Sequence, residues 1–338
     1  MSIITNPITL PASKFLSTIT ALIGEIRFNS TLEPSEIVDD LVESCRIGKV
    51  DYGKGIINDF KLDVQPVNDL SETSTVTKIT KPNIAQETIE IDQYKFIPLS
   101  ISEVLTKDSA LSGEIVSRFL DFVMSLLEDT LKFHLYDIMV KDYMDWTPGQ
   151  ATQTVQINQI DTTSLTGADL EYAERWNATQ IGKVMRKTFN NMRIKNNKFT
   201  DIANYTDVND GSTVKKVVSA LSRDNLKIVF NDKYYTDFLA DAMASLYHSE
   251  KVGEMIPGER FVLLPEDSVD TDNTKTIAWL SAKNKFALAD FYKLTLSFAD
   301  ASTLYVNYFL HVSYGHGVFE YAPGVKFVAN LISPPSAG

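Results

Sequence analysis

The stretch ALSGEIVSRFLDFVMSLLEDTLKFHLYDIMVKDYMDW, residues 110–146, decides the fold class of this chain. Apolar residues recur along it at three- and four-residue spacing, which is typical of an amphipathic helix: Leu111, Ile115, Phe119, Phe122, Leu126, Phe133 and Tyr136. Ser109 or Ser112 can cap its start, and no Pro follows until Pro148. Such a helix would be roughly 50 Å long, so we expect it to span a whole domain.

Upstream, residues 1–51 predict two short helices. The first has an apolar stripe made of Phe15, Ile19, Leu22, Ile23 and Ile26, and the second has Ile37, Val38, Leu41 and Val42, ending near Gly48. Each is too short to be stable alone in water. We therefore expect them to dock, either on the body of their own chain or on a neighbouring subunit.

Residues 52–98 predict a long two-stranded hairpin. β-Branched residues dominate the stretches 76–80 and 84–97, and the polar stretch 68–75 is expected at the tip. An isolated hairpin is marginally stable in water, so this one should lie on a partner surface.

The rest of the chain mixes helices and strands, which makes the class α+β. Residues 147–171 predict a loop or an irregular sheet. Two helices are expected at 177–193 and 233–248, the second capped by Asn231. Strands are expected at 226–230, 261–264, 286–298, 304–314, 318–321 and 325–329. In the strand 304–314, Val306, Tyr308, Leu310 and Val312 should share one apolar face.

Composition excludes several classes of protein. The chain has 338 residues, a formal net charge of −12 and one cysteine, Cys45, so an intramolecular disulfide framework is excluded. The acidic balance argues against a protein that grips nucleic acid tightly. No uncharged stretch is apolar enough for a membrane span, and neither a signal peptide nor membrane association is expected.

Catalytic motifs are absent from the sequence. It has neither a Gly-rich phosphate loop nor a G-x-S-x-G run. His311 and His316 resemble a metal pair but lack a third ligand nearby, so we expect no metal site and no cofactor. The residues Asp267, Asp270 and Asp272 do not match a calcium loop, and Cys45 is expected to be a buried thiol.

One basic run interrupts the acidic chain: Lys183, Arg186, Lys187, Arg193, Lys195 and Lys198, with no acid among them. It can be a patch that meets nucleic acid, or a solvated helix face that pairs with acidic groups of this chain or of a neighbouring subunit.

The order of these elements resembles the major capsid protein of tailed bacteriophages, with the Hong Kong 97-like fold. The stretches that carry the resemblance are IDQYKFIPLSISEVLTKDSALSGEIVSRFLDFV (91–123), NLKIVFNDKYYTDFLADAM (225–243), GERFVLLPED (258–267) and GVFEYAPGVKFVAN (317–330). The resemblance implies an N-terminal arm at 1–51 and an extended loop at 52–98. It further implies a spine helix of the peripheral domain at 99–146, a mainly axial domain with some peripheral elements at 147–285, and peripheral-domain strands at 286–338.

The resemblance also implies partners and a location. The chain would form pentamers and hexamers of a virion capsid around double-stranded DNA, assembled in the host bacterial cytoplasm with a separate scaffolding protein and a portal. The residues expected at contacts between subunits are Phe15, Ile19, Leu22, Lys61, Lys78, Lys81 and Tyr94, and the basic run would face the lumen or a neighbour. An encapsulin-like compartment and a cytoplasmic α+β enzyme acting through His311 and His316 are the alternatives.

Overall fold

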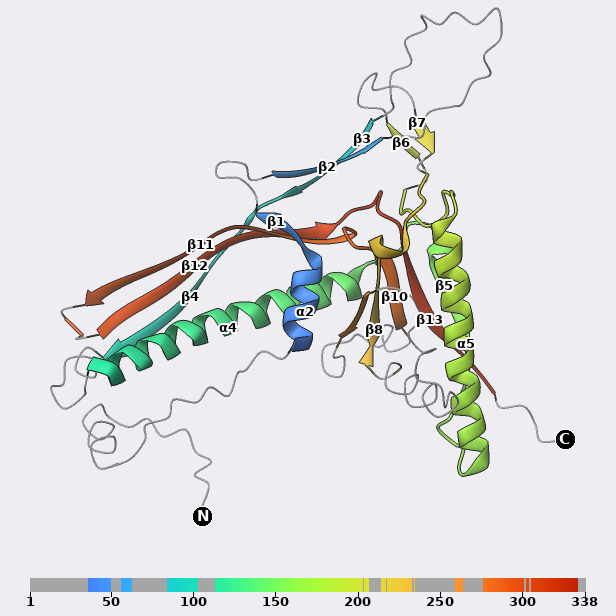
Figure 1. Ribbon diagram of the computed structural model, residues 1–338, viewed down its shortest axis with the longest axis horizontal. Helices are drawn as coiled ribbons and strands as arrows, with labels where there is room; N and C mark the ends of the chain where they lie inside the picture. Colours follow the sequence, from blue (N-terminus) through green and yellow to red (C-terminus); the bar gives the residue numbers. More distant parts are fainter. Residues whose placement is uncertain are drawn as a thin grey trace, which may run out of the picture.

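The computed structural model describes residues 36–49, 56–62, 84–102, 113–202, 204–206, 214–216, 218–232, 234, 259–263, 276–300, 302–303 and 305–333. Within them the chain has an α+β fold built around two larger sheets, one beside the long helix and one beside a second helix (Figure 1). The predicted class is confirmed. The first predicted helix of 1–51 lies outside the described residues. Residues 63–83 of the predicted hairpin also lie outside them, as does the predicted helix 233–248 apart from Tyr234.

The long helix is α4 (Gly113–Asp145), with 33 residues, as predicted. It runs along a four-stranded sheet whose strands follow the order β1 (Arg46–Lys49), β11 (Phe286–Asp300), β12 (Tyr305–Val318) and β4 (Gln93–Ser102). Helix α2 (Glu36–Cys45) crosses α4 near the middle of the molecule (Figure 1). Three of the four residues of the predicted stripe, Val38, Leu41 and Val42, are buried together with Cys45, whereas Ile37 is exposed.

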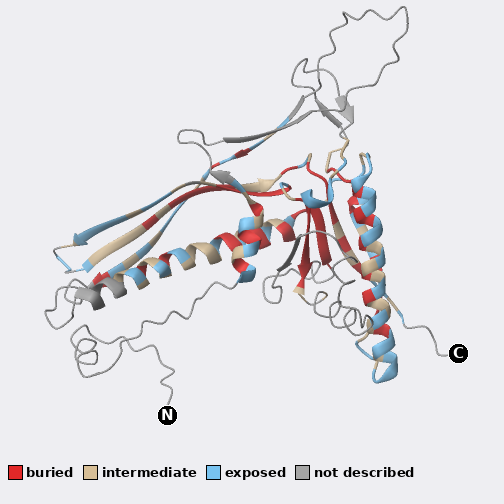
Figure 2. Cartoon of the chain, in the orientation of Figure 1, coloured by how far each residue is buried: buried red, intermediate tan, exposed pale blue. Residues whose placement is uncertain are grey.

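A hydrophobic core joins α2, α4 and the sheet. At its centre the rings of Tyr143 and Phe286 stack with 3.7 Å between centroids, and the rings of Trp146 and Trp279 lie edge-on to this pair. Figure 2 shows that burial is concentrated here and falls off toward the far ends of β11 and β12. The four-stranded sheet is therefore anchored at one end and projects from the core at the other.

The second sheet has five strands in the order β5 (Thr154–Ile160), β13 (Gly324–Ile332), β10 (Thr276–Ala282), β8 (Leu226–Asn231) and β9 (Glu259–Leu263). Helix α5 (Ala168–Arg193) packs on it through an apolar stripe that includes Ile181, Met185 and Phe189. Two 3-10 turns, Ala151–Gln153 and Arg223–Asn225, lead into β5 and β8. Every residue of β8 and β10 is buried, so this sheet is the most enclosed part of the described chain.

Two small hairpins complete the fold: β2 (Ile56–Leu62) with β3 (Ile84–Glu90), and β6 (Asn204–Thr206) with β7 (Val214–Lys216). The prediction of one strand over 84–97 was wrong. The strand ends at Glu90, and β4 begins at Gln93 and pairs with β12 in the four-stranded sheet. Here the chain passes so close to β12 that a Cβ on Gly315 would lie 2.5 Å from the carbonyl oxygen of Glu90.

Three further boundaries differ from the sequence prediction. Helix α5 begins at Ala168 and not at 177, and of its first nine residues only Ala173 is buried. Strand β5 lies in the stretch expected to be irregular. Strand β12 continues through Val318, so no separate strand covers 318–321. The sequence prediction missed strand β10. In the structure the side chain of Asn231, the last residue of β8, donates a hydrogen bond to the carbonyl of Thr276, the first residue of β10, at 3.1 Å.

None of the helices in the described part of the chain has a stretch long and apolar enough to cross a membrane.

Candidate functional site

The distal half of the four-stranded sheet has two apolar faces. Toward α4, Leu310 and Val312 are buried beside Leu127 and Leu135, as the alternation in β12 predicted. The opposite face, which we call the outer sheet face, carries six apolar side chains, Tyr94, Phe96, Leu294, Leu296, Phe298 and Phe309, and among them the polar residues His311, Ser100 and Asn307. The register places them together, because Phe96 lies opposite His311 and His311 opposite Leu294, with Phe309 and Leu296 paired next along the strands.

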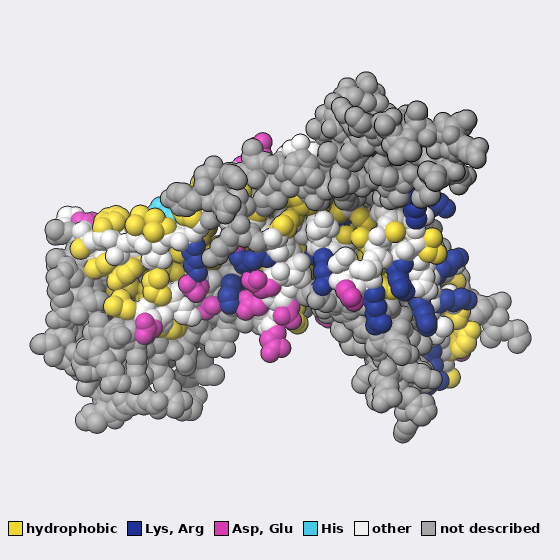
Figure 3. Space-filling view, turned by 45° about the horizontal axis from the view of Figure 1, so that its top comes forward, with side chains coloured by type: hydrophobic (Ala, Val, Ile, Leu, Met, Phe, Trp, Pro, Cys, Tyr) yellow, Lys and Arg dark blue, Asp and Glu magenta, His cyan; other side chains and the backbone are white. Residues whose placement is uncertain are grey.

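The outer sheet face is exposed although it is apolar. The exposed fraction is 65% for Tyr94, 58% for Phe96 and 57% for Phe298. The rings of Phe298 and Phe309 stack on one another, with 5.4 Å between centroids. Figure 3 shows the hydrophobic side chains gathered over β11, β12 and β4. Large exposed apolar patches mark interaction surfaces.

A β-bulge in β11 directs the three β11 side chains of this face, Leu294, Leu296 and Phe298, away from α4. In β11, Leu288 lies opposite His316 and is buried toward α4, whereas Leu294 lies opposite His311 on the other face. The register shifts between Asp290 and Tyr292. One extra residue moves every later side chain to the other face of a sheet. The run KLTLSF (293–298) therefore turns its polar residues toward α4 and its apolar ones toward solvent.

The six residues of the basic run are all exposed. Lys183, Arg186, Lys187 and Arg193 lie on α5, opposite its buried stripe, and Lys195 and Lys198 follow in the next loop. Figure 3 shows Lys and Arg side chains over this side of the molecule. Among the described residues none of the six is paired with a carboxylate. All six side chains are therefore accessible to solvent.

The β2–β3 hairpin is tied to the body at its base. The carboxylate of Glu87 accepts hydrogen bonds from the backbone N–H groups of Glu320 at 2.6 Å and Tyr321 at 3.0 Å. Ile89 is buried against Phe319 and Ala322. Of the residues predicted at contacts between subunits, Tyr94 lies on the outer sheet face and Lys61 lies in β2. The other five, Phe15, Ile19, Leu22, Lys78 and Lys81, lie outside the described residues.

His311 and His316 do not converge on a common site. His316 Nδ1 lies 2.8 Å from Asp142 Oδ2 on α4, whereas His311 lies on the outer sheet face with its ring 6.0 Å from that of Phe96. No cluster of His, Cys, Asp and Glu side chains suited to a metal ion occurs among the described residues. His134 contacts the Tyr314 hydroxyl through Nε2 at 2.8 Å, and burial lowers the pKa of His134.

The His316–Asp142 pair gives a pH-dependent prediction. The hydrogen bond that His316 Nδ1–H donates to the Asp142 carboxylate raises the pKa of His316 above 6.5. The contribution of the His316–Asp142 pair to folding stability is then complete below the pKa that His316 has in the unfolded chain. It is lost as the pH rises through the higher pKa that His316 has in the folded chain. We expect His316→Gln to lower the free energy of unfolding by about 1 kcal/mol near pH 5.5 and by less near pH 8.5, as measured by urea unfolding. Asp142→Asn should remove the same contribution. An equal effect of either variant at both pH values would contradict the assignment.

A buried ion pair lies where the two sheets meet. Lys285 is fully buried, and its Nζ donates hydrogen bonds to Asp201 Oδ2 at 2.7 Å and to the carbonyls of Phe319 at 3.1 Å and Ala322 at 2.9 Å. Asp201 also accepts hydrogen bonds from Trp146 Nε1 at 3.1 Å and from a Gln153 Nε2 donor at 2.8 Å. Burial lowers the pKa of Lys285, against the opposing effect of Asp201. The pair joins the end of α4 to the loops of both sheets.

A second buried lysine lies beside the single thiol. Lys227 Nζ is 3.3 Å from Cys45 Sγ and donates to the Ser44 carbonyl at 3.3 Å. Cys45 is buried, as predicted. These contacts connect α2 to strand β8 of the five-stranded sheet.

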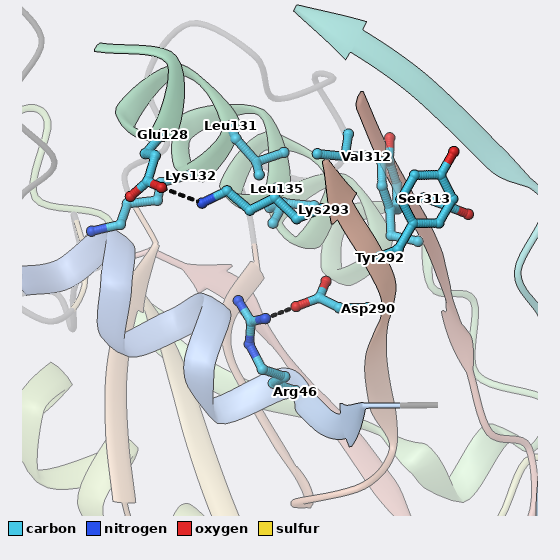
Figure 4. A pocket seen from close by; sticks show the side chains of 11 residues that line it. Arg46, Glu128, Leu131, Lys132, Leu135, Asp290, Tyr292, Lys293, Val312 and Ser313 are labelled. Carbon is cyan, nitrogen blue, oxygen red and sulfur yellow. Dashed lines mark hydrogen bonds and ion pairs between the residues drawn. The ribbon is translucent and has the colours of Figure 1, made fainter. Parts of the chain in front are cut away.

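Figure 4 shows a cavity of about 330 Å³ between α4, β11 and β12. Its charged side chains are already paired within the chain: Arg46 with Asp290, Lys293 with Glu128 at 2.6 Å, and Lys132 with Asp39 at 2.9 Å. No charged group in it is left over for a charged substrate, and the lining does not form a recognisable catalytic set.

Sequence reasoning missed both the outer sheet face and the Lys285–Asp201 pair. The alternation in KLTLSF was a usable signal, but the bulge that fixes its direction cannot be located from the sequence. The ion pair joins residues 84 positions apart, and neither lies in a motif.

The chain matches the family model described as "Phi29-like phage major capsid protein" over residues 51–328. No curated protein matches it in sequence. The fold is similar to a chain in a structure of the head fiber and inner core protein gp22 of native bacteriophage P68, with 10% identity, a TM-score of 0.56, and coverage of 91% of this chain and 88% of that one.

Two capsid structures resemble the chain to the same degree. The capsid of cyanophage P-SCSP1u has 11% identity and a TM-score of 0.55, with coverage of 93% and 95%. The mature capsid of bacteriophage PhiM1 has 10% identity and a TM-score of 0.54, with coverage of 91% of each chain. At such identities the likeness concerns the fold alone.

Proposed function

Because the chain belongs to the Phi29-like phage major capsid protein family, we propose that it assembles as pentamers and hexamers into an icosahedral shell around the double-stranded DNA of a tailed bacteriophage. The observation that carries this proposal is the family match over residues 51–328. The structure supports it physically, since the four-stranded sheet projects from the core and presents an apolar face that a lone subunit leaves in water. Closed symmetric assemblies bury such faces between identical copies.

The proposed architecture is the Hong Kong 97-like fold. Residues 1–51 are the N-terminal arm, 52–98 the extended loop, and 99–146 the spine helix of the peripheral domain. Residues 147–285 are mainly the axial domain with peripheral elements, and 286–338 the peripheral-domain strands and C-terminus. Strand β13 pairs with β10 and β5, so we place this strand of the last segment with the axial sheet.

The proposed partners follow from this role. The chain acts as a structural protein of the virion without enzymatic activity or cofactor, and it is assembled in the bacterial cytoplasm with a separate scaffolding protein and a portal. The net charge of −12 suits a container that does not hold its DNA tightly.

The basic surface of α5 faces either the lumen or a neighbouring subunit. The variant Lys183→Gln/Arg186→Gln/Lys187→Gln removes three charges from an exposed helix face, so we expect the subunit to fold unchanged. If the surface meets a neighbour, the variant should form fewer shells at equal protein concentration. If it faces the lumen, shells should form normally, and mass spectrometry after DNA crosslinking should recover fewer peptides from 183–198.

Sedimentation velocity tests the proposal. The chain, a 37.8 kDa subunit, should sediment as a homogeneous species of megadalton mass when it is co-expressed with the proposed scaffolding protein. An encapsulin-like protein would instead form small closed shells alone and retain a cargo protein. A monomer or dimer under all conditions would contradict both shell functions.

A further inference from the structure

Helix α2 has an acidic exposed face, made of Glu36, Ile37, Asp40 and Glu43. The helix contains four acids and no basic residue, and the three acids of this face lie at spacings that place them on one side. All three are exposed, and Glu43 forms a surface ion pair with Arg46 at 3.1 Å. Ile37 lies among them with an exposed fraction of 38%. Like charges one turn apart repel each other, so a cationic surface docked here would stabilise the helix.

Helix α5 has a basic exposed face, made of Lys183, Arg186 and Lys187 and continued by Ile194 and Lys195 where the helix ends. Like charges again lie one turn apart, at Lys183 and Lys187. Ile194 has an exposed fraction of 65%. Surfaces that bind nucleic acid are more polar than surfaces that bind protein. An exposed isoleucine within the basic face therefore favours a protein partner with its own exposed apolar residue.

The two faces lie on opposite sides of the five-stranded sheet, whose order begins with β5 and ends with β8 and β9. Asn177 joins α5 to β5, since its side chain accepts a hydrogen bond from the Ile160 N–H at 2.7 Å and donates one to the Ile160 carbonyl at 3.0 Å. Lys227 joins α2 to β8 through Ser44 and Cys45. Figure 1 shows α2 and α5 well apart, with β10 and β13 between them. The acidic face and the basic face of one chain therefore cannot dock on each other.

Complementary faces on opposite sides of a subunit suit head-to-tail association. In a heterologous contact each copy uses one face toward the copy before it and the other face toward the copy after it. Such contacts close into a ring when the rotation between copies allows it. The charge pattern of this chain meets that requirement, because every copy carries one acidic and one basic helix face.

The exposed isoleucines fix the orientation of the two helices. With Ile37 opposite Ile194 and the helices antiparallel, the equal rise per residue brings Glu43 close to Lys187. Glu36 then lies close to the lysine at position 195. In the parallel orientation most of α2 would extend beyond the end of α5, and its acids would lose the cations of that helix.

We propose that the acidic face of α2 docks, in antiparallel orientation, on the basic face of α5 of a neighbouring copy of this chain. The inference rests on the proposed shell function and adds which two surfaces join adjacent subunits. It also assigns the basic face to a contact between subunits and not to the enclosed DNA. In such a contact the charges set the orientation and the rate of association, and the isoleucines are removed from water.

Charge reversal tests the docking. The variants Glu36→Lys/Glu43→Lys and Lys187→Glu/Lys195→Glu change only exposed side chains, so each subunit should fold as the wild type does. Either variant alone places like charges at the contact and should yield at least about tenfold fewer shells in electron micrographs at equal protein concentration. The chain with all four substitutions again has opposite charges at the contact and should recover at least about half of the wild-type yield.

The matched control combines Glu36→Lys/Glu43→Lys with Lys95→Glu/Lys141→Glu, at two exposed lysines of β4 and α4. It restores the net charge away from the contact, so shells should stay scarce, and equal recovery in both combined variants would overturn the docking. Normal shell yields from either two-residue variant would overturn it as well. If the α5 variant forms normal shells but loses DNA crosslinks at 183–198, the basic face belongs to the lumen. If the wild type forms no shells at all, the proposed function itself fails.

A cysteine crosslink covers the case in which the charge variants do not fold. Ile37→Cys and Ile194→Cys proteins are mixed, assembled and treated with a short bis-maleimide, and the wild type gives the background from the buried Cys45. A covalent dimer of the two variants requires a contact between copies. As the matched control, Tyr172→Cys near the other end of α5, 56% exposed, replaces Ile194→Cys. It should give at least about fivefold less dimer, because it lies roughly 33 Å away along the helix. Shells without the dimer, or equal dimer yields from both mixtures, would contradict the docking.

Discussion

Replacing Lys285 with Met is expected to lower the free energy of unfolding of the subunit by about 3–5 kcal/mol. The ammonium group is fully buried, and all three of its protons are used by Asp201 and by the carbonyls of Phe319 and Ala322. Met has a similar volume, so the cost comes from leaving the Asp201 carboxylate, with its charge, beside unpaired carbonyl groups in a region closed to water.

The control for this prediction is Lys293→Met. Lys293 also pairs with a carboxylate, Glu128 at 2.6 Å, but the pair is about half exposed, so its loss should change stability by no more than about 0.5–1 kcal/mol. Urea unfolding followed by tryptophan fluorescence measures both, and Lys285→Met/Asp201→Asn should recover part of the loss. A change of less than about 1 kcal/mol in Lys285→Met would mean that the pair is not closed to solvent.

The second large effect is expected for Phe286→Ala, which should cost about 3–5 kcal/mol of folding stability. The ring of Phe286 is fully buried, stacks on Tyr143 at 3.7 Å and meets Trp146 edge-on. These residues join α4 to β11. Removing the ring of Phe286 therefore leaves a cavity at the anchored end of the four-stranded sheet and weakens the packing that holds this sheet on α4.

Phe298→Ala is the matched control, because it removes the same ring from the same strand at the exposed end. We expect a change in folding stability within about 0.5 kcal/mol together with a clear loss of assembly. The two variants thus separate folding from association. Equal losses of folding stability in both would show that the distal sheet is packed as a core and would contradict the assignment of its outer face to an interface.

Much of the fold could be predicted because its pattern is local. The apolar spacing over 110–146 was enough to predict helix α4, and the LKIVF run was enough to predict strand β8. The failures were of two kinds. The start of α5 was missed because only Ala173 of residues 168–176 is buried, so the first turns add little to the apolar stripe. The break at Ile91–Asp92 was missed because β3 and β4 have similar β-branched composition while they pair with different partners.

The two candidate surfaces also differ in whether the sequence predicts them. The basic run was predictable, since four of its six charges lie on one helix, α5, at spacings that place them on the same face. The outer sheet face was not, because its side chains come from residues about 200 positions apart and their common direction depends on one bulge. Such long-range register is set by packing and leaves no local trace in the sequence.

Negative-stain electron microscopy of the chain, expressed with and without the products of its neighbouring genes, tests the central claim most directly. The account predicts closed shells of uniform diameter, built of five- and six-membered rings, when the scaffolding protein is present, and rings, tubes or irregular shells when it is absent. A field of monodisperse monomers or dimers in every combination would contradict the claim that this chain is a shell-forming subunit.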